Sequence, residues 1–285
     1  MEDYIKSLMR ETDVCKLWKI GETIEIDDTH DIVIFVQVMP NLDNDIILKN
    51  KKNVNIFVCN TEQLSYYIDA FIFNLKPFIG HIEGNNNVTF GIIDYSIQNI
   101  DILKNNKYMK DQKFDIIYMP YQYKKQEVDK LIGFRNENTK FKKICVLGVP
   151  TPRRVELIKK LTNEGVVIDH IFGFRDVRDK EVMKYKILLN LSSENEYKIY
   201  EHIRCDRLIF SKMVILSEMK NDMDKIDVGE MINWTETDDI IDNLVKILKN
   251  FNEHKNKITD DKLNEVWENR KKMFDDFIQK YETKY

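Results

Sequence analysis

The sequence predicts an α/β protein made of two Rossmann-like, doubly wound domains that face a cleft. Short apolar runs rich in β-branched and aromatic residues alternate with helix-like segments, as expected for parallel strands buried on both faces. The alternation restarts after a polar stretch at 133–143. A chain of 285 residues with 43% hydrophobic residues is also long enough for two cores. We therefore expect an N-terminal domain at 1–138 and a C-terminal domain at 139–285 that includes the terminal helices.

The N-terminal half contains four strand-like runs separated by helix-like segments. We expect strands at 31–38, 53–60, 88–94 and 114–120, with helices at 64–75 and 96–106. Strands that alternate with helices pair in parallel through crossover connections. The aromatic run within 66–73 is expected to lie in the core and not to form a platform for sugar rings.

The C-terminal half repeats this architecture without repeating the sequence. The expected strands are 143–149, 166–173, 187–192 and 213–218, and the expected helices are 153–165, 178–186, 201–212, 236–250 and 260–281. Ligands of such sheets bind at the carboxyl ends of the strands. We therefore expect functional residues directly after the strands.

Composition and charge exclude several classes of function. The net charge of −4 argues against nucleic acid as a partner, since phosphate backbones need a basic surface. No apolar run approaches the ~20 residues of a membrane span, and the acidic, polar start shows no secretory signal. The four cysteines are scattered, as in reduced intracellular proteins. We expect a cytoplasmic protein, in the host cytoplasm if it is viral, and a homodimer is compatible with the sequence.

The start of the helix at 153–165 indicates an anion site. Thr151 is a good N-cap and Pro152 fits the first helical position, so Arg153 and Arg154 fall in the first turn. Cations at this end oppose the helix dipole at a cost of about 0.3–1 kcal/mol each. A diphosphate bound between the helix amides and the two guanidinium groups removes the conflict. The alternative is a pair of solvated arginines on a surface helix. Neither a glycine-rich dinucleotide motif nor a P-loop is present.

Three more charged residues are expected at the same sheet edge. Glu201 and Arg204 are three residues apart and share a helix face, and Glu218 ends the strand at 213–218. A carboxylate at this edge can accept hydrogen bonds from ribose hydroxyls, and an arginine can pair with phosphate. The alternative is an internal Glu201–Arg204 ion pair without a ligand.

The order of these motifs resembles the donor half of GT-B-type glycosyltransferases. The segments "PRRVELIKKL", "KYKILLNL" and "YEHIRCDRLIFSKMVILSE" are similar to small spore-coat-glycosyltransferase-like proteins of bacteria and giant viruses, and "NTEQLS", "IDYSIQNI" and "YMPYQY" resemble their N-terminal half. The resemblance implies a hexosyltransferase-like enzyme with the nucleotide-sugar donor on the C-terminal domain and a glycan or protein acceptor on the N-terminal one. Many retaining members carry an E-x7-E pair, where this chain has Lys198 and Asp206. A degenerate nucleotide-sugar or glycan-binding protein is therefore the alternative.

The expected chemistry needs cations for the leaving group and, if the enzyme inverts the anomeric carbon, an acceptor base; the sequence leaves retention or inversion open. Arg153, Arg154 and Arg204 would stabilise the departing diphosphate in place of a metal. Glu62 and Asp94 follow strand ends and are the candidates for the base, although both also fit helix caps. We interpret the acidic stretches at 27–31 and 43–45 as solvated loops. No metal and no cofactor is therefore expected, and the nucleotide sugar is the substrate.

Overall fold

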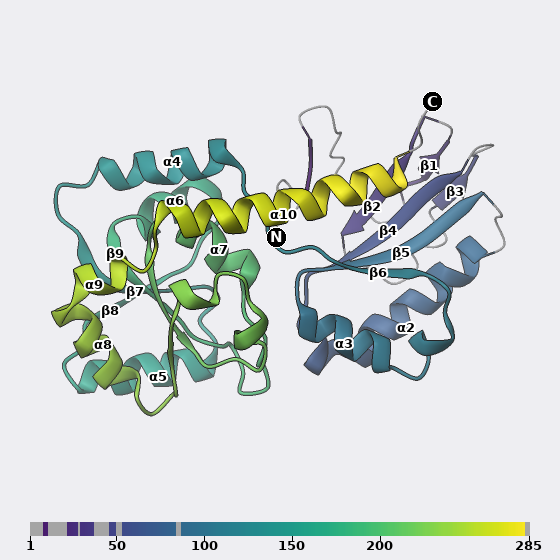
Figure 1. Cartoon of the computed structure of the whole chain (residues 1–285). Helices are drawn as coiled ribbons and strands as arrows, with labels where there is room; N and C mark the ends of the chain where they lie inside the picture. The colour runs from purple at the N-terminus through teal and green to yellow at the C-terminus, as the bar shows by residue number, and fades with distance from the viewer. Residues whose placement is uncertain are drawn as a thin grey trace. The chain divides into compact units, whose positions relative to one another are not determined.

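The computed structural model describes residues 8–10, 22–27, 29–36, 46–49, 53–83 and 87–282 (Figure 1). The chain forms two compact units, which are described separately. Unit 1 comprises Met1–Gln122 and Arg270–Tyr285, and unit 2 comprises Tyr123–Asn269. The acidic stretch at 43–45 lies outside the described residues.

The division between the units falls earlier than the boundary at 138 that the polar stretch suggests. Helix α4 (Lys125–Asn136) belongs to unit 2, where Glu127 accepts a hydrogen bond of 2.7 Å from Arg207. Arg207 is buried and also donates to Asp179, so one guanidinium joins three helices of this unit. Helix α10 (Asp260–Tyr281) contributes its last turns to unit 1.

Unit 1 contains a parallel sheet with the strand order β2-β4-β5-β6 and a separate parallel pair, β1-β3. Helices α2 and α3 contact each other, as expected where successive strands are added in one direction. The described part of this sheet has no reversal of strand order. The elements of this unit are β1 (Ile24–Ile26), β2 (Ile32–Val36), β3 (Ile46–Leu48), β4 (Val54–Asn60), α2 (Leu64–Glu83), β5 (Val88–Asp94), α3 (Ile97–Asn105), η2 (Met109–Asp111) and β6 (Asp115–Tyr118).

The two faces of β4 pack against different helices. Val54, Ile56 and Val58 alternate along the strand and join the core cluster that includes α2. Phe57 points the other way, with ring centroids 5.0 Å from Phe277 and 4.8 Å from Tyr281 in α10. The end of α10 therefore completes the core of unit 1.

The aromatic run at 66–73 is only partly in this core. Ile72 is buried, whereas Tyr66 is 56% exposed and Phe73 is 75% exposed. The prediction that the run as a whole is core is therefore wrong. The period of the helix places one of its faces toward solvent even though the residues there are aromatic.

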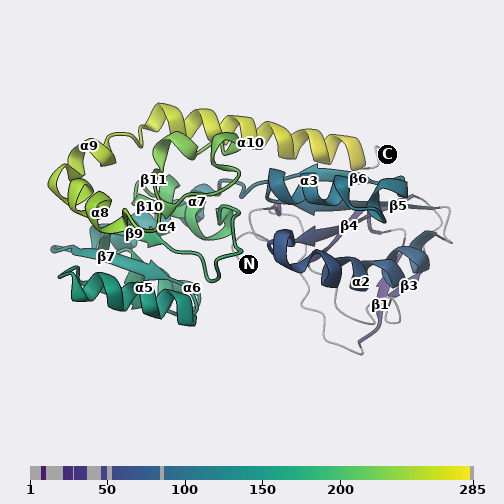
Figure 2. The same ribbon diagram turned by 90° about the horizontal axis from the view of Figure 1, so that it is seen from below.

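Unit 2 is a five-stranded parallel sheet with the strand order β11-β10-β9-β7-β8. Strand β7 has β8 on one side and β9 on the other, so the order reverses there and the sheet is doubly wound. Figure 2 shows the molecule from the side of α5 and α8, which share a core cluster on one face. Helices α4, α6 and α7 contact one another. The remaining elements are β7 (Lys142–Leu147), α5 (Pro152–Asn163), β8 (Ile168–Ile171), α6 (Arg175–Val182), β9 (Tyr185–Asn190), α7 (His202–Phe210), β10 (Val214–Glu218), η3 (Met223–Lys225), η4 (Gly229–Met231), β11 (Asn233–Thr235), α8 (Ile240–Lys249) and α9 (Phe251–Lys255).

Candidate functional site

The first turn of α5 follows the carboxyl end of β7, at the reversal of strand order in unit 2. Thr151 is the N-cap, its side chain accepts from the backbone N–H of Arg154, and Pro152 begins the helix. The predicted cap is therefore confirmed. The hydroxyl of Thr151 also donates to the carbonyl of Ser193 over 2.8 Å, which ties α5 to the loop after β9. In doubly wound sheets, ligands bind at such a reversal, beyond the carboxyl ends of the strands.

Arg153 and Glu218 form a two-pronged ion pair across this edge. Nη2 of Arg153 lies 2.5 Å from Oε1 of Glu218, and Nη1 lies 3.1 Å from Oε2. Glu218 also accepts from the backbone N–H of Ser192 over 2.7 Å and from the hydroxyl of Thr237 over 2.8 Å. Burial opposes ionisation of Glu218, but the hydrogen bonds from Arg153 and Ser192 outweigh it and lower the pKa of the carboxyl. Glu218 thus holds Arg153 in one orientation.

Arg154 is a buried cation that donates to neutral acceptors. Nε and Nη2 reach the carbonyl of Leu191 over 3.1 and 2.9 Å, and Nη1 reaches the carbonyl of Val149 over 2.9 Å. The residue is 2% exposed, so the alternative of two solvated surface arginines is wrong. Burial, together with the charge of Arg204, lowers the pKa of Arg154 to about 10. In the described part of the chain, no carboxylate forms an ion pair with it.

Arg204 and Arg154 approach each other over Gly148. Arg204 donates to the side-chain carbonyl of Asn190 over 3.1 Å, and its Nη2 lies 3.8 Å from Oε2 of Glu201. A Cβ atom at residue 148 would lie 2.8 Å from Nη1 of Arg154 and 3.4 Å from Nη2 of Arg204. The φ of Gly148 is +127°, which L side chains rarely adopt. Glycine is therefore needed here for backbone and guanidinium alike.

Lys220 lies at the same edge, although sequence reasoning missed it. Its ammonium donates to the hydroxyl of Ser192 and to the carbonyl of Tyr197, the latter over 3.1 Å. The residue is 4% exposed, and burial lowers its pKa to about 8. The only signal in the sequence was a lysine shortly after an apolar strand. Lysines on the protein surface occur at the same kind of position, so this signal does not distinguish a buried lysine from an exposed one.

These side chains form one group with excess positive charge, which we call the cation cluster. Its four cations outnumber its two carboxylates, so the group carries a formal surplus of two positive charges. The members influence one another electrostatically, as expected for charges that share a poorly solvated edge. The cluster brings together all five donor-site residues predicted from the sequence and adds one. Its members are Arg153, Arg154, Arg204, Lys220, Glu201 and Glu218.

The two candidate bases lie in unit 1 and differ in their environment. Asp94 at the end of β5 is fully buried and accepts from Asn60 over 2.7 Å, Asn99 over 3.1 Å and the backbone N–H of Ser96 over 2.8 Å. Ser96 in turn caps α3. Glu62 is exposed, and its backbone carbonyl accepts from the side chains of Asn60 and Asn99. One hydrogen-bond network therefore shapes both strand ends.

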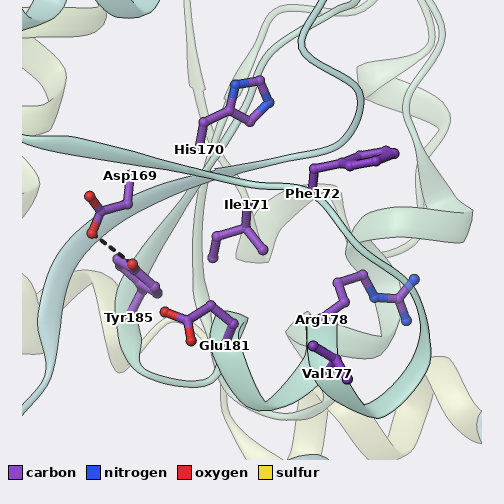
Figure 3. A pocket seen from close by; sticks show the side chains of 8 residues that line it. All are labelled: Asp169, His170, Ile171, Phe172, Val177, Arg178, Glu181 and Tyr185. Atoms are coloured by element: carbon purple, nitrogen blue, oxygen red, sulfur yellow. Dashed lines mark hydrogen bonds between the residues drawn. The ribbon is translucent and has the colours of Figure 1, made fainter.

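A shallow hollow of about 350 Å³ lies beside the cation cluster, at the edge strand β8 (Figure 3). His170 connects the two, because its Nε2 lies 2.9 Å from the carbonyl oxygen of Gly148. Burial, opposed by this contact, lowers the pKa of His170, and the charge of Arg154 adds to the lowering. The hollow is lined by Asp169, His170, Ile171, Phe172, Val177, Arg178, Glu181 and Tyr185.

Among the described residues, no group of three or more His, Cys, Asp or Glu side chains is arranged to hold a metal ion. In the acidic stretch at 27–31, Asp27 accepts from Thr29 over 2.9 Å and forms a small turn. No helix in the described ranges combines the length and the apolar character that crossing a bilayer requires.

Comparison with known proteins shows relatives in a giant virus. The chain is 30% identical over 237 residues to "Uncharacterized protein L140" of Acanthamoeba polyphaga mimivirus, which covers 82% of this chain and 70% of that protein. The chain belongs to the family of this mimivirus protein. It is also 29% identical over 233 residues to "Uncharacterized protein L138" and 31% identical over 198 residues to "Uncharacterized protein L137" of the same virus. The relation to giant-virus proteins expected from the sequence is thus confirmed.

These relatives differ in length. The matches cover 80% and 68% of this chain, but only 24% of L138 and 25% of L137. No family model matches the chain. Among solved structures, "Crystal Structure of alpha1,3-Fucosyltransferase" is similar with a TM-score of 0.44 and 12% identity, covering 90% of this chain and 85% of that one. A similarity at this level carries no weight for activity.

Proposed function

We propose that this chain is a GT-B-type glycosyltransferase that moves a sugar from a nucleotide-diphosphate donor to a glycan or protein acceptor. The observation that carries the proposal is the cation cluster at the β7/β9 reversal of unit 2. Burying charge is costly, and Arg154 and Lys220 are buried against neutral acceptors. A diphosphate supplies the two negative charges that the cluster lacks.

Glycosyl transfer breaks the bond between the anomeric carbon and the diphosphate, so negative charge grows on the leaving oxygen. Fixed cations at that oxygen stabilise the transition state more than the ground state. We assign this role to Arg154 and Arg204, which flank Gly148, in place of a metal ion. Each oxygen of Glu218 already accepts two hydrogen bonds, so we assign it to positioning Arg153. Glu201, which is partly exposed, is assigned to the ribose hydroxyls.

The acceptor base is proposed to be Glu62. A base must reach the acceptor hydroxyl, and Glu62 is exposed at the end of β4. Asp94 was the second candidate from the sequence. Its full burial and its three hydrogen-bond donors favour a role in holding the strand ends of unit 1.

The second candidate function is a nucleotide-sugar or glycan-binding protein that has lost turnover. The observation that favours it is Asp206, which takes the place of an expected glutamate. This carboxylate is fully buried in α7 and accepts from His202 over 2.8 Å. Measurement of diphosphate released from nucleotide sugars separates the two candidates, because only an enzyme gives turnover.

Thermal unfolding with uridine and guanosine diphosphate tests the proposal. We expect at least one of them to raise the melting temperature, and we expect Arg153→Ala with Arg154→Ala to abolish the shift. The matched control is Lys159→Ala with Lys160→Ala, which removes two exposed cations farther along the same helix and should keep the shift. If no nucleoside diphosphate shifts the wild-type protein, the proposed function is wrong.

A further inference from the structure

Lys220 has an incomplete set of hydrogen bonds for a buried ammonium. An ammonium has three donors, and in the described part of the chain only Ser192 and Tyr197 accept from this one. Both acceptors are neutral oxygens. With 4% exposure, the third donor is largely shielded from water. Such a group is costly unless an anion completes it.

Ser192 joins this ammonium to the Arg153–Glu218 pair. Its backbone N–H donates to Glu218 over 2.7 Å, its carbonyl accepts from Arg153 over 2.9 Å, and its hydroxyl accepts from Lys220. The same hydroxyl donates to the carbonyl of Tyr197 over 2.9 Å. Three cluster members therefore meet at one residue directly after β9, and Lys220 belongs to the anion-facing edge.

The charges divide the cluster into compensated and uncompensated cations. Arg153 is neutralised by Glu218, and Arg204 is partly neutralised by Glu201 at 3.8 Å. Arg154 and Lys220 donate only to neutral acceptors in the described residues. Within the cation cluster, the surplus of two charges thus lies on these two side chains, which are the natural partners of a dianion. Asp222, which is not a member of the cluster, also interacts electrostatically with Lys220, but burial raises the pKa of this carboxyl and so disfavours its charged form.

We propose that Lys220 is a diphosphate-binding residue, whose remaining donor is taken by a phosphate oxygen of the donor substrate. This inference rests on the proposed function and adds a ligand contact to it. It also gives donor binding a defined dependence on pH. The ammonium form binds the dianion and the neutral amine does not.

The direction of the pH effect follows from the charges around Lys220. Burial lowers its pKa to about 8, with Arg204 and Arg153 lowering it further and Glu218 and Glu201 opposing them. The contribution of Lys220 to diphosphate affinity is therefore fully present well below pH 8 and is lost as the pH rises through about 8. A bound dianion favours the ammonium and raises its pKa. The charged groups that face it are Glu218 on β10, Arg204 on α7, Glu201 at the start of α7, Arg153 on α5 and Asp222 in the following turn.

The test is titration calorimetry with uridine and guanosine diphosphate between about pH 7 and about pH 9. We expect wild-type affinity to fall about tenfold over this range. Lys220→Met should bind about tenfold to a hundredfold more weakly at neutral pH and lose the fall. Lys220→Arg, which stays charged, should keep binding without the fall.

A purely structural role predicts a different pattern. If Lys220 only fastens the loop after β9, Lys220→Met should weaken binding by the same factor at about pH 7 and at about pH 9. We expect its loss to be largest at about pH 7 and to shrink by about pH 9, where the wild-type amine is itself neutral. The control is Lys198→Met, which removes an exposed cation from the same loop and should bind within about threefold of wild type with the pH dependence kept. A loss in Lys220→Met that is equal at both pH values, or unchanged binding in that variant, would overturn the inference. Absence of binding to the wild-type protein at any pH would instead overturn the proposed function.

Discussion

Both units gather polar side chains at the carboxyl ends of parallel strands, but the two groups differ in charge balance. In unit 1, Asp94 accepts three hydrogen bonds from two amide side chains and a backbone N–H, and it is completely buried. In unit 2, two of the four cations in the cation cluster have only neutral acceptors among the residues that the structure describes. The first group satisfies itself, whereas the second carries a surplus of charge.

This difference indicates which strand ends hold the fold and which bind a ligand. A buried carboxylate surrounded by donors has its hydrogen bonds satisfied by the protein alone. Buried cations without carboxylates raise the free energy of the unliganded protein, and a bound anion recovers it. Both groups therefore lie at the ends of strands, and only the cation cluster carries the uncompensated charge that indicates a ligand site.

The largest expected effect is on the hydrogen-bond network around Asp94 in unit 1. Asp94→Ala removes one acceptor from each of three donors. These are the backbone N–H of Ser96 and the side-chain amides of Asn60 and Asn99, which keep the carbonyl of Glu62 as their other acceptor. We expect the free energy of unfolding to fall by about 3–5 kcal/mol, at about 1–3 kcal/mol for each affected donor with partial relaxation. Urea denaturation measures this, with the exposed Asp69→Ala as the control, which should change little. A variant as stable as the control would show that Asp94 is not a structural centre.

A smaller effect is expected where the backbone makes room for two cations. Gly148→Ala places a methyl group 2.8 Å from Arg154 at a φ of +127°. We expect a loss of about 2–3 kcal/mol in unfolding free energy and weaker binding of nucleoside diphosphates, because the guanidinium must move. The control is Gly133→Ala, within α4, where a Cβ meets no atom within 4 Å. That change should stabilise the protein by about 0.5–1 kcal/mol. Unaltered nucleotide binding in Gly148→Ala would show that Arg154 does not take part in binding the nucleotide.

Local signals in the sequence predicted most of the elements, but they missed β1, β3, α4 and β11. Thr151, Pro152 and the arginines that follow marked a helix start, and α5 begins at Pro152. The parallel α/β character of both units is confirmed. Strand order was not predictable, because an apolar run shows that a strand is buried without showing which strand lies beside it. The reversal at β7 in unit 2, and its absence from the described sheet of unit 1, depend on contacts distant in sequence.

The candidate site was predictable where charge conflicted with local structure. Arg153 and Arg154 oppose the dipole of their own helix, and this local conflict pointed to an anion. Lys220 gave no such signal, because its significance comes from burial against Ser192, 28 positions away in the chain. The prediction that the aromatic run of α2 is buried was wrong for a related reason. Composition indicated burial, while the helical period left Tyr66 and Phe73 exposed.

The smallest of these effects concerns the Arg153–Glu218 ion pair of the cation cluster. Like Asp94, Glu218 is a carboxylate whose oxygens all accept hydrogen bonds. Glu218→Gln removes the charge opposite Arg153, whose side chain is 15% exposed and can regain some water. We expect a loss of about 2 kcal/mol in unfolding free energy at neutral pH.

The pH dependence of that loss tests its origin. The pKa of Glu218 is lowered in the folded protein, so its contribution is fully present above the ordinary carboxyl pKa and disappears as pH falls through the folded value. The stability difference between wild type and Glu218→Gln should therefore shrink on acidification below about pH 4.5. Denaturation at a series of acidic pH values measures this, with the exposed Glu156→Gln on the same helix as Arg153 as the control. A difference that stays constant through the acidic range would mean that Glu218 acts by shape and not by charge, and that Arg153 needs no carboxylate to hold it in place.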